Sequence, residues 1–397
     1  MTTSLKILLL IVPALLLQSI AFPQPTDRNW RLYGHLQTMQ QVWVPPGVSQ
    51  WQTMTALGNR LDFRWHPGNK FSFHAGVRNN ASLGQMVHDY HPYFAEFSTL
   101  DDGLIDLTHM WINDSSIFFY SNIDRLNVKF RTGNFEAIVG RQRINWGMNL
   151  IWTPNDIFNA YNYFDFDYVE RPGCDAVLLQ YYTGHTSSLQ FGLKVDRHLY
   201  VIDSAYKVTG ALMYRFNRWG YDFQFLGGVM REDAVVGLGW AGHIRGAGFN
   251  GEASYFLDRK QLFDTTGAVV ASAEMNYTFK NSLYLQGGYL YNSAGTAGAA
   301  GWGAAFMLAV DISAKNFTKA RHSLFAQASY PITPLINASL AGIFNPNDKS
   351  GFAGPSVDLS LTTNLSLLFT GQIFWGDEKT AYGDYGTLCY MRLKWSF

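Results

Sequence analysis

Residues 125–170 concentrate the charged side chains that could act on a solute. Five basic side chains come first: Arg125, Lys129, Arg131, Arg141 and Arg143. Four carboxylates follow them: Asp156, Asp165, Asp167 and Glu170. Facing each other across water, the two sets would create a transverse field, and rows of Arg and Lys favour anions. The alternative is that these charges pair with one another and stabilise a wall. The sequence leaves both open.

Patterns for catalysis and metal binding are weak elsewhere in the chain. Ser and His residues are scattered, and neither a G-x-S-x-G nor an H-E-x-x-H pattern occurs. Residues 88–91 contain two His but have no matching ligand cluster. Asn345, Asn347 and Asp348 are ordinary turn residues. We therefore expect no catalytic residue, no metal site and no cofactor.

In the segments that are expected to position these charges, the hydropathy pattern repeats every two residues. Apolar and polar residues alternate over 60–65, 71–78, 125–131, 188–195 and 269–279, as in transmembrane β-strands. Charges persist along the polar side, whereas the apolar side is bulky and ends in aromatics, which lie at membrane interfaces. Because an open sheet edge would leave backbone groups unpaired in lipid, such strands must close. The sequence therefore predicts an all-β protein, a transmembrane antiparallel β-barrel of the outer-membrane type.

Short and long connections alternate along the chain, as expected of such a barrel. The short turns are predicted at 66–69, 132–134, 183–186, 217–220, 280–281, 331–334 and 363–364. The long connections are predicted near 79–116, 144–173, 196–206, 257–268, 345–353 and 376–386. Residues 292–321 are assigned to a further long loop. A full strand at 301–311 would place the short turn at 331–334 at the end of the barrel where the long connections are expected. The count is about 18 strands, within a range of 16–20.

The first 21 residues predict a cleaved signal peptide. Lys6 precedes an apolar run at 7–17, and small residues follow at Ser19 and Ala21. Residues 22–397 are then expected to form one barrel. Lys plus Arg and Asp plus Glu number 30 each, which argues against nucleic acid as a partner. The mean hydropathy of −0.07 argues against a bundle of membrane helices.

The C-terminus predicts an assembly signal. Apolar residues ending in Trp395 and Phe397 alternate with polar ones over 390–397. This pattern resembles the insertion signal that the barrel assembly machinery reads, which favours a terminal aromatic on an alternating last strand. The resemblance implies that machinery as a partner. It also implies a location in the outer membrane of a Gram-negative cell envelope, among its lipids.

Residues 140–175 form the least strand-like stretch of the chain. The residues GRQ at 140–142, NWG at 145–147 and PND at 154–156 resemble a motif of the porin-like and alginate-export-like outer-membrane barrels. The resemblance implies a porin or an export channel. A connection at 144–173 with so many aromatics is unlike disorder, and we expect it to fold into the lumen as a constriction. Arg141 and Arg143 share parity with apolar Val139, so a bulge near Gly140 is needed for both to point inward.

The sequence thus predicts a porin-like channel through which hydrophilic solutes, with a preference for anions, diffuse passively. One alternative is a non-conducting barrel that binds surface polysaccharide through loop aromatics such as Trp146, Trp152, Tyr161 and Tyr163. Another is a lipid-modifying enzyme, and a third is a transporter of hydrophobic substrates. We expect no enzymatic activity. The transported solute and a homo-oligomeric state stay open.

Overall fold

The structure is a computed structural model that describes residues 29–47, 50–160, 163–166, 171–197, 206–261, 267–298 and 312–397. The predicted signal peptide, Asp167, Glu170 and Tyr161 lie outside these residues. The first strands are β1 (Trp30–Val44), β2 (Gln52–Trp65), β3 (Phe71–Leu83), β4 (Thr108–Asp114), β5 (Ile117–Thr132), β6 (Phe135–Gln142), β7 (Cys174–Tyr182), β8 (Ser188–Arg197) and β9 (Tyr206–Arg218). The next strands are β10 (Tyr221–Met230), β11 (Asp233–Ile244), β12 (Ala247–Asp258), β13 (Ala268–Thr278) and β14 (Tyr284–Asn292). The last are β15 (His322–Thr333), β16 (Ile336–Asn345), β17 (Ser350–Thr362), β18 (Leu365–Trp375) and β19 (Thr387–Ser396).

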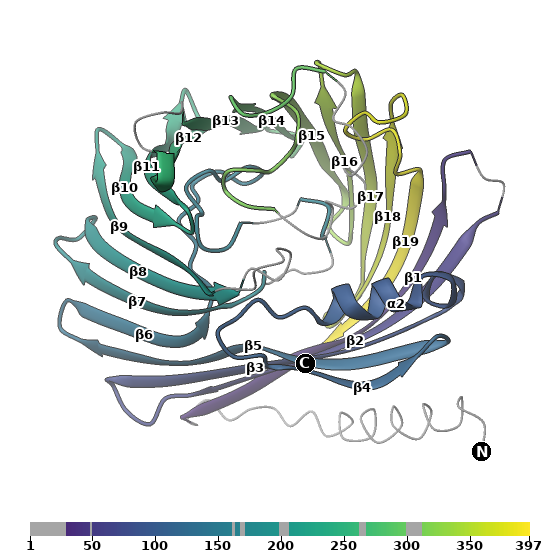
Figure 1. Cartoon of the computed structure of the whole chain (residues 1–397), viewed down its shortest axis with the longest axis horizontal. Helices are drawn as coiled ribbons and strands as arrows, with labels where there is room; N and C mark the ends of the chain where they lie inside the picture. The colour runs from purple at the N-terminus through teal and green to yellow at the C-terminus, as the bar shows by residue number, and fades with distance from the viewer. Residues whose placement is uncertain are drawn as a thin grey trace.

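The strands close into a barrel whose wall has 18 members. Neighbours pair antiparallel around the ring, and β1 pairs with both β2 and β19. Because β3 pairs directly with β5, β4 adds no member to the ring. Gly34 and Phe397 exchange two backbone hydrogen bonds of 3.0 Å at the seam. Figure 1 looks along the barrel and shows the ring. The prediction of a closed barrel with about 18 strands is confirmed.

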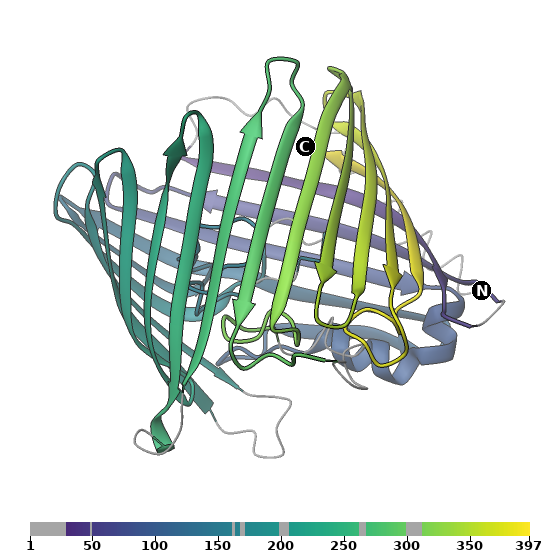
Figure 2. The same cartoon turned by 90° about the horizontal axis from the view of Figure 1, so that it is seen from above.

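Only short turns lie at one end of the barrel, and the long connections lie at the other end together with short ones at 231–232 and 346–349 (Figure 2). The prediction of a long connection near 345–353 is therefore wrong. The short turns between β2 and β3, β5 and β6, β7 and β8, and the later pairs share one end with Trp30 and Phe397. The predicted short turns are confirmed, and the turn between β11 and β12 adds one that the sequence analysis missed. β14 pairs directly with β15, which agrees with the assignment of residues 292–321 to the connection between them. We call the two ends the short-turn end and the long-loop end.

The outward face of the barrel is apolar and carries aromatics at the short-turn end. Trp65 stacks on Phe73 with ring centroids 5.2 Å apart, and Phe71 lies 5.1 Å from Phe130. Such rings match an interfacial girdle. No helix among the described residues is long and apolar enough to span a bilayer.

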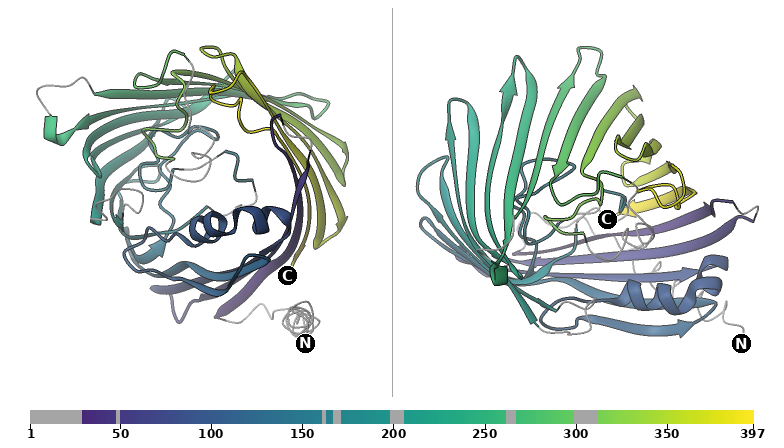
Figure 3. Two further views of the ribbon diagram at one scale, coloured as in Figure 1. Left: turned by 45° about the vertical axis from the view of Figure 1, so that its right-hand side comes forward. Right: turned by 45° about the horizontal axis from the view of Figure 1, so that its top comes forward.

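A helix inside the barrel was not predicted. α2 (Gln85–Thr99) follows β3 within the expected long connection at 79–116, and Figure 3 shows it within the ring. Its buried Val87 and Ala95 pack on Phe118 of β5, with Met54 and Met110 beside them. The helix therefore forms a second layer behind β2, β3, β4 and β5. A short η1 (Arg259–Gln261) follows β12.

Strands β6 and β7 do not reach the long-loop end of the wall. β6 pairs with residues 126–132 of β5, and β4 pairs with residues 117–122 along the same edge of β5. Gly103 forms a bridge with Asp196 at the end of β8. Residues 101–114, the wall insert, thus complete the wall where the chain between β6 and β7 leaves it.

Arg141 joins the wall insert to the shortened strands. Its guanidinium donates to both carboxylate oxygens of Asp175, at 2.8 and 2.9 Å, and to Asp101 Oδ2 at 2.6 Å. It also donates to the Ile105 carbonyl oxygen at 2.6 Å. A Cβ on Gly103 would lie 2.1 Å from Nη2 of this arginine, so the joint requires glycine there.

The bulge expected near Gly140 is on another strand. β6 pairs with β5 and β7 without a shift in register through Gly140. The register shifts instead opposite Gly76, where Asp124 is the extra residue of β5. As a result, Asp124 and Arg125 are both buried on the lumen side. Gly140 has a φ of +112°, and its close approach to the Leu126 carbonyl leaves no room for a side chain.

We predict that Arg141→Met loosens the wall insert. The change leaves Asp101 and Asp175, whose side chains are 5% and 14% exposed, without their cation, which costs at most about 3–5 kcal/mol. Limited proteolysis of the folded barrel should then cut within 101–107, where the unaltered protein resists. Arg131→Met, at an exposed position on β5, is the matched control. Equal resistance of the two variants to the protease would contradict the role of this joint.

Candidate channel lumen

One side of the lumen is strongly basic. Pairing registers place nine Lys and Arg residues on the inward face of β19, β1, β2, β3 and β5 among the described strands. They are Arg31, Arg60, Arg64, Arg78, Arg125, Lys129, Arg131, Arg392 and Lys394. The same strands hold only two carboxylates, Asp62 and Asp124. The excess of positive charge is therefore a property of this whole sector, which we call the basic wall.

Part of this charge is compensated. Arg60 donates to Asp62 at 2.5 Å and to Asp124 at 2.6 Å, with all three side chains buried. His74 Nε2 also lies 2.9 Å from Asp62. Lys129 pairs with Glu136 of β6 at 2.7 Å. The sequence left open whether these charges act on solutes or pair with one another to stabilise the wall. The structure supports both, because several of the charges form ion pairs while the sector keeps a net positive charge.

The opposite side of the lumen is acidic. Strands β10 to β18, all of them described, carry no Lys or Arg. Their six carboxylates are Asp222, Asp233, Glu252, Asp258, Glu274 and Asp358. The two signs of charge are therefore segregated across the barrel, which is the arrangement that creates a transverse field.

The described part of residues 143–173, which we call the inward loop, folds into the lumen against this acidic wall. Glu252 accepts backbone hydrogen bonds from Met148, from Asn149 at 2.6 Å and from Asn155 at 2.8 Å. Glu274 accepts hydrogen bonds from the two backbone amides that follow Asn149, at 2.9 and 2.8 Å. The two carboxylates therefore provide hydrogen-bond acceptors for the backbone amides of a segment that pairs with no strand.

Further polar contacts fix the rest of the inward loop. The Trp146 indole donates to Gln190 of β8 at 2.8 Å, and Gln224 of β10 donates to the Trp146 carbonyl oxygen at 2.6 Å. Asn155 donates to the Leu238 carbonyl oxygen at 3.0 Å. The loop thus follows the wall from β8 to β13, and Figure 3 shows it within the ring.

Glycines in the wall make room for the inward loop. A Cβ on Gly192 of β8 would lie 2.6 Å from the Phe158 ring. A Cβ on Gly237 or Gly239 of β11 would lie 2.7 or 2.9 Å from the Asn155 side chain. Alternate glycines on β11 therefore let the loop approach the backbone of the wall.

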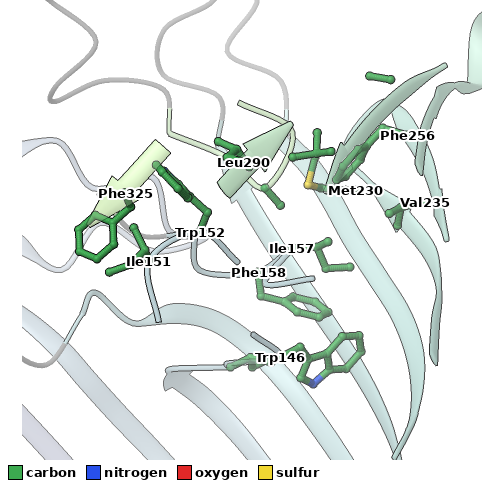
Figure 4. Packing of buried hydrophobic residues seen from close by; sticks show 14 of the residues in the cluster. Trp146, Ile151, Trp152, Ile157, Phe158, Met230, Val235, Phe256, Leu290 and Phe325 are labelled. Atoms are coloured by element: carbon green, nitrogen blue, oxygen red, sulfur yellow. The ribbon is translucent and has the colours of Figure 1, made fainter. Parts of the chain in front are cut away.

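Apolar side chains of the inward loop pack on the inner face of the wall. Trp146, Ile151, Trp152, Ile157 and Phe158 are buried there. The inward side chains beside them include Val235, Phe256, Leu290 and Phe325 (Figure 4). The described residues 163–166 extend these contacts to β17, β18 and β19 through aromatic pairs. Packing and the carboxylates together hold the loop in place.

Asp156 is the most perturbed charge of the inward loop. Its side chain is fully buried, and Arg171 Nη1 lies 3.9 Å from one carboxylate oxygen. Burial raises its pKa to about 7, although Arg143 and Arg171 act in the opposite direction. Burial and the neighbouring Arg171 lower the pKa of Arg143. The two charges expected at 143 and 156 therefore lie close together.

The structure separates the predicted site residues into groups. Arg125, Lys129 and Arg131 lie on the basic wall, Arg141 lies in the joint of the wall insert, and Asp165 is exposed on the inward loop. The sequence analysis did not single out Glu252 and Glu274, nor the basic residues of β1, β2, β3 and β19. The sequence shows that these residues alternate with apolar neighbours, but it does not show that they come together on one side of the lumen, because that depends on the order of the strands.

No protein-family model matches the chain, and no curated protein matches it. Solved structures do resemble it. OccAB3 of Acinetobacter baumannii has a TM-score of 0.58 and 11% identity over 93% of this chain and 99% of that one. OccK11 (OpdR) of Pseudomonas aeruginosa has a TM-score of 0.57 and 12% identity over 93% and 96%. The shared feature is the fold of an outer-membrane porin.

OccK2 (OpdF) of Pseudomonas aeruginosa, solved in complex with glucuronate, has a TM-score of 0.57 and 12% identity over 93% of this chain and 96% of that chain. These neighbours support the porin-like part of the sequence resemblance. The alginate-export-like part stays a prediction.

We predict that docking of the inward loop weakens as the pH rises. The pKa of Asp156 is about 7 in the docked loop against an ordinary 3.8, so the docked state binds the proton more tightly. The stability that protonation contributes, at most roughly 4 kcal/mol, is present below pH 4 and is lost as the pH rises to about 7. Burial of the Asp156 carboxyl group raises this pKa, and Arg143 and Arg171 act against the rise.

Hydrogen exchange of the loop amides at pH 5 and pH 8 tests this. After correction for the intrinsic exchange rates, protection should be lower at pH 8. Asp156→Asn should reduce the difference, and Asp165→Asn, at an exposed loop position, should keep it. An undiminished difference in Asp156→Asn would show that another group is responsible.

Proposed function

We propose that this protein is an outer-membrane channel for passive diffusion of small hydrophilic solutes, with a preference for anions. The segregation of charge across the lumen carries the proposal. An anion that enters meets a sector with nine basic residues and two carboxylates on the described strands. In a narrow aqueous pore such a sector raises the local concentration of anions.

The structural neighbours support the class of protein. Porins of the Occ group share the barrel over most of their length. One of them, OccK2, was solved with glucuronate. Glucuronate is a hydrophilic carboxylate, and solutes of that chemistry would suit the basic wall of this barrel. The preference for anions is our inference from the charges.

We propose further that the inward loop narrows the channel. Its described residues occupy the lumen along β8 to β13 and continue to β19. Five backbone hydrogen bonds to Glu252 and Glu274 keep it there. A solute must therefore pass between the loop and the basic wall.

The alternative functions have less support. Trp146 and Trp152 are 1% and 4% exposed inside the barrel, so they offer no surface for stacking on a polysaccharide. Tyr163 packs on Phe325 with ring centroids 5.4 Å apart. We keep the barrel assembly machinery as a proposed partner, with Trp395 and Phe397 as its signal.

Substitution of Arg125, Lys129 and Arg131 by Ser should reduce the preference for anions. At about 8 Å in water each cation attracts an anion by about 0.5 kcal/mol, so loss of three corresponds to a change of roughly tenfold at low salt. The reversal potential of single channels under a salt gradient measures this. Arg218, Arg245 and Lys280 at the short-turn end provide the control. An unaltered reversal potential would place the three side chains outside the ion path.

Substitution of Glu252 and Glu274 by Gln should release the inward loop. Each charge-assisted hydrogen bond contributes about 1.5–3 kcal/mol, and Gln keeps the size of the side chain. The single-channel conductance should rise or switch between two levels. Asp358→Asn, on the same wall near the short-turn end, is the control. A folded double variant with ordinary conductance would show that the loop does not narrow the pore.

A further inference from the structure

The outward face of β1 to β5 differs from the rest of the barrel. On β8 to β19, all described, Asn, Gln, Ser and Thr occupy outward positions only at strand ends, at Thr333, Thr362 and Thr387. Besides Thr132 at the end of β5, the outward positions of β1, β2, β3 and β5 include seven such residues: Thr38, Gln40, Thr53, Thr55, Asn59, Asn79 and Ser121. We call this set, with Trp111 of β4, the outer polar patch.

Part of the patch is a continuous row of hydrogen bonds across four strands. Asn79 Nδ2 donates to Asn59 Oδ1 at 3.2 Å, and Ser121 Oγ donates to Asn79 Oδ1 at 2.6 Å. The indole of Trp111, whose side chain is 60% exposed, donates to Ser121 Oγ at 2.8 Å. A parallel bond of 2.8 Å joins Thr55 to Gln40. The patch is therefore an ordered feature of the wall.

The row lies within the apolar band. Asn59 is six residues from Trp65 of the aromatic girdle, which is roughly 20 Å along a strand and about 15 Å in height at the usual tilt. The hydrocarbon-facing band of such barrels is about 25 Å tall. Apolar residues flank the row on each strand, as Leu57 and Leu61 do on β2. The hydrogen bonds within the row reduce the cost of these side chains against lipid, but each Asn amide has two N–H groups and donates only one of these bonds.

We propose that the outer polar patch is the contact surface between two copies of this chain in the membrane. A second copy brings the same row to the same depth, because the bilayer fixes the height of both barrels. Amides and hydroxyls each supply donors and acceptors, so the patch can pair with its own kind, as a symmetric interface requires. Hydrogen bonds of this type join membrane segments.

The charges of this face disfavour a phosphate-bearing lipid as the occupant. The outward positions of β1, β2, β3 and β5 hold no Lys or Arg over their described lengths. A phosphorylated headgroup would need such cations. On the lumen side, α2 packs behind the same strands. The surface that would meet the second copy is therefore a two-layered, stiff part of the wall.

Cross-linking in native outer membranes tests the proposal. Thr53→Cys, in the patch but outside the hydrogen-bonded row, is prepared on a Cys389→Ser background, because Cys389 is exposed and Cys174 is buried. A bifunctional maleimide should link two copies. Leu324→Cys on the outward face of β15 is the matched control and should stay unlinked. Equal linking at both positions, or none at position 53, overturns the proposal.

A second variant tests the row itself. Asn59→Leu, Asn79→Leu and Ser121→Ala together should convert the purified oligomer, in mild detergent, to single barrels that keep heat-modifiable migration and channel activity. An oligomer that persists in the folded triple variant contradicts the proposal. The proposal is also contradicted if the unaltered protein purifies as a single barrel with lipid bound to this face. If the triple variant does not fold, the linking of the Thr53→Cys protein decides.

Discussion

Every backbone amide that enters a bilayer needs a partner within the protein, and this requirement determines the architecture of the chain. It forces the strands to close, so that β1 pairs with β19 and Phe397 bonds to Gly34 at the seam. It also explains the wall insert. Where β6 and β7 end early, their neighbours β5 and β8 would face lipid with open edges, and residues 101–114 supply the missing partners.

The same requirement governs the inward loop, with a different solution. A segment that leaves the sheet loses its partners, and in the lumen it has carboxylates in their place. Glu252 and Glu274 each accept several amides of the loop. Because a carboxylate offers about four acceptor sites, two side chains can serve a stretch of irregular backbone. The acidic wall thus has a structural role as well as an electrostatic one.

The fold was largely predictable because its signals are local. Alternation, short turns and the terminal Phe397 each depend on a few neighbouring residues. The lumen was less predictable because it depends on strand order. Arg125 and Arg392 are far apart in sequence but share one wall, since β19 returns to β1. The bulge was assigned to Gly140, although Asp124 carries it, because a sequence shows a break in parity without showing which of two neighbouring strands absorbs it.

The joint at Arg141 has a consequence for how this wall forms. It ties Asp101 to Asp175, and the bridge from Gly103 to Asp196 spans a still longer stretch of chain. Most of the barrel can grow by adding one hairpin beside the last, which keeps loop closure inexpensive. The sector from β3 to β8 cannot, because its edge is complete only after residues made much earlier have moved into place. These strands must therefore enter the membrane as one cooperative unit.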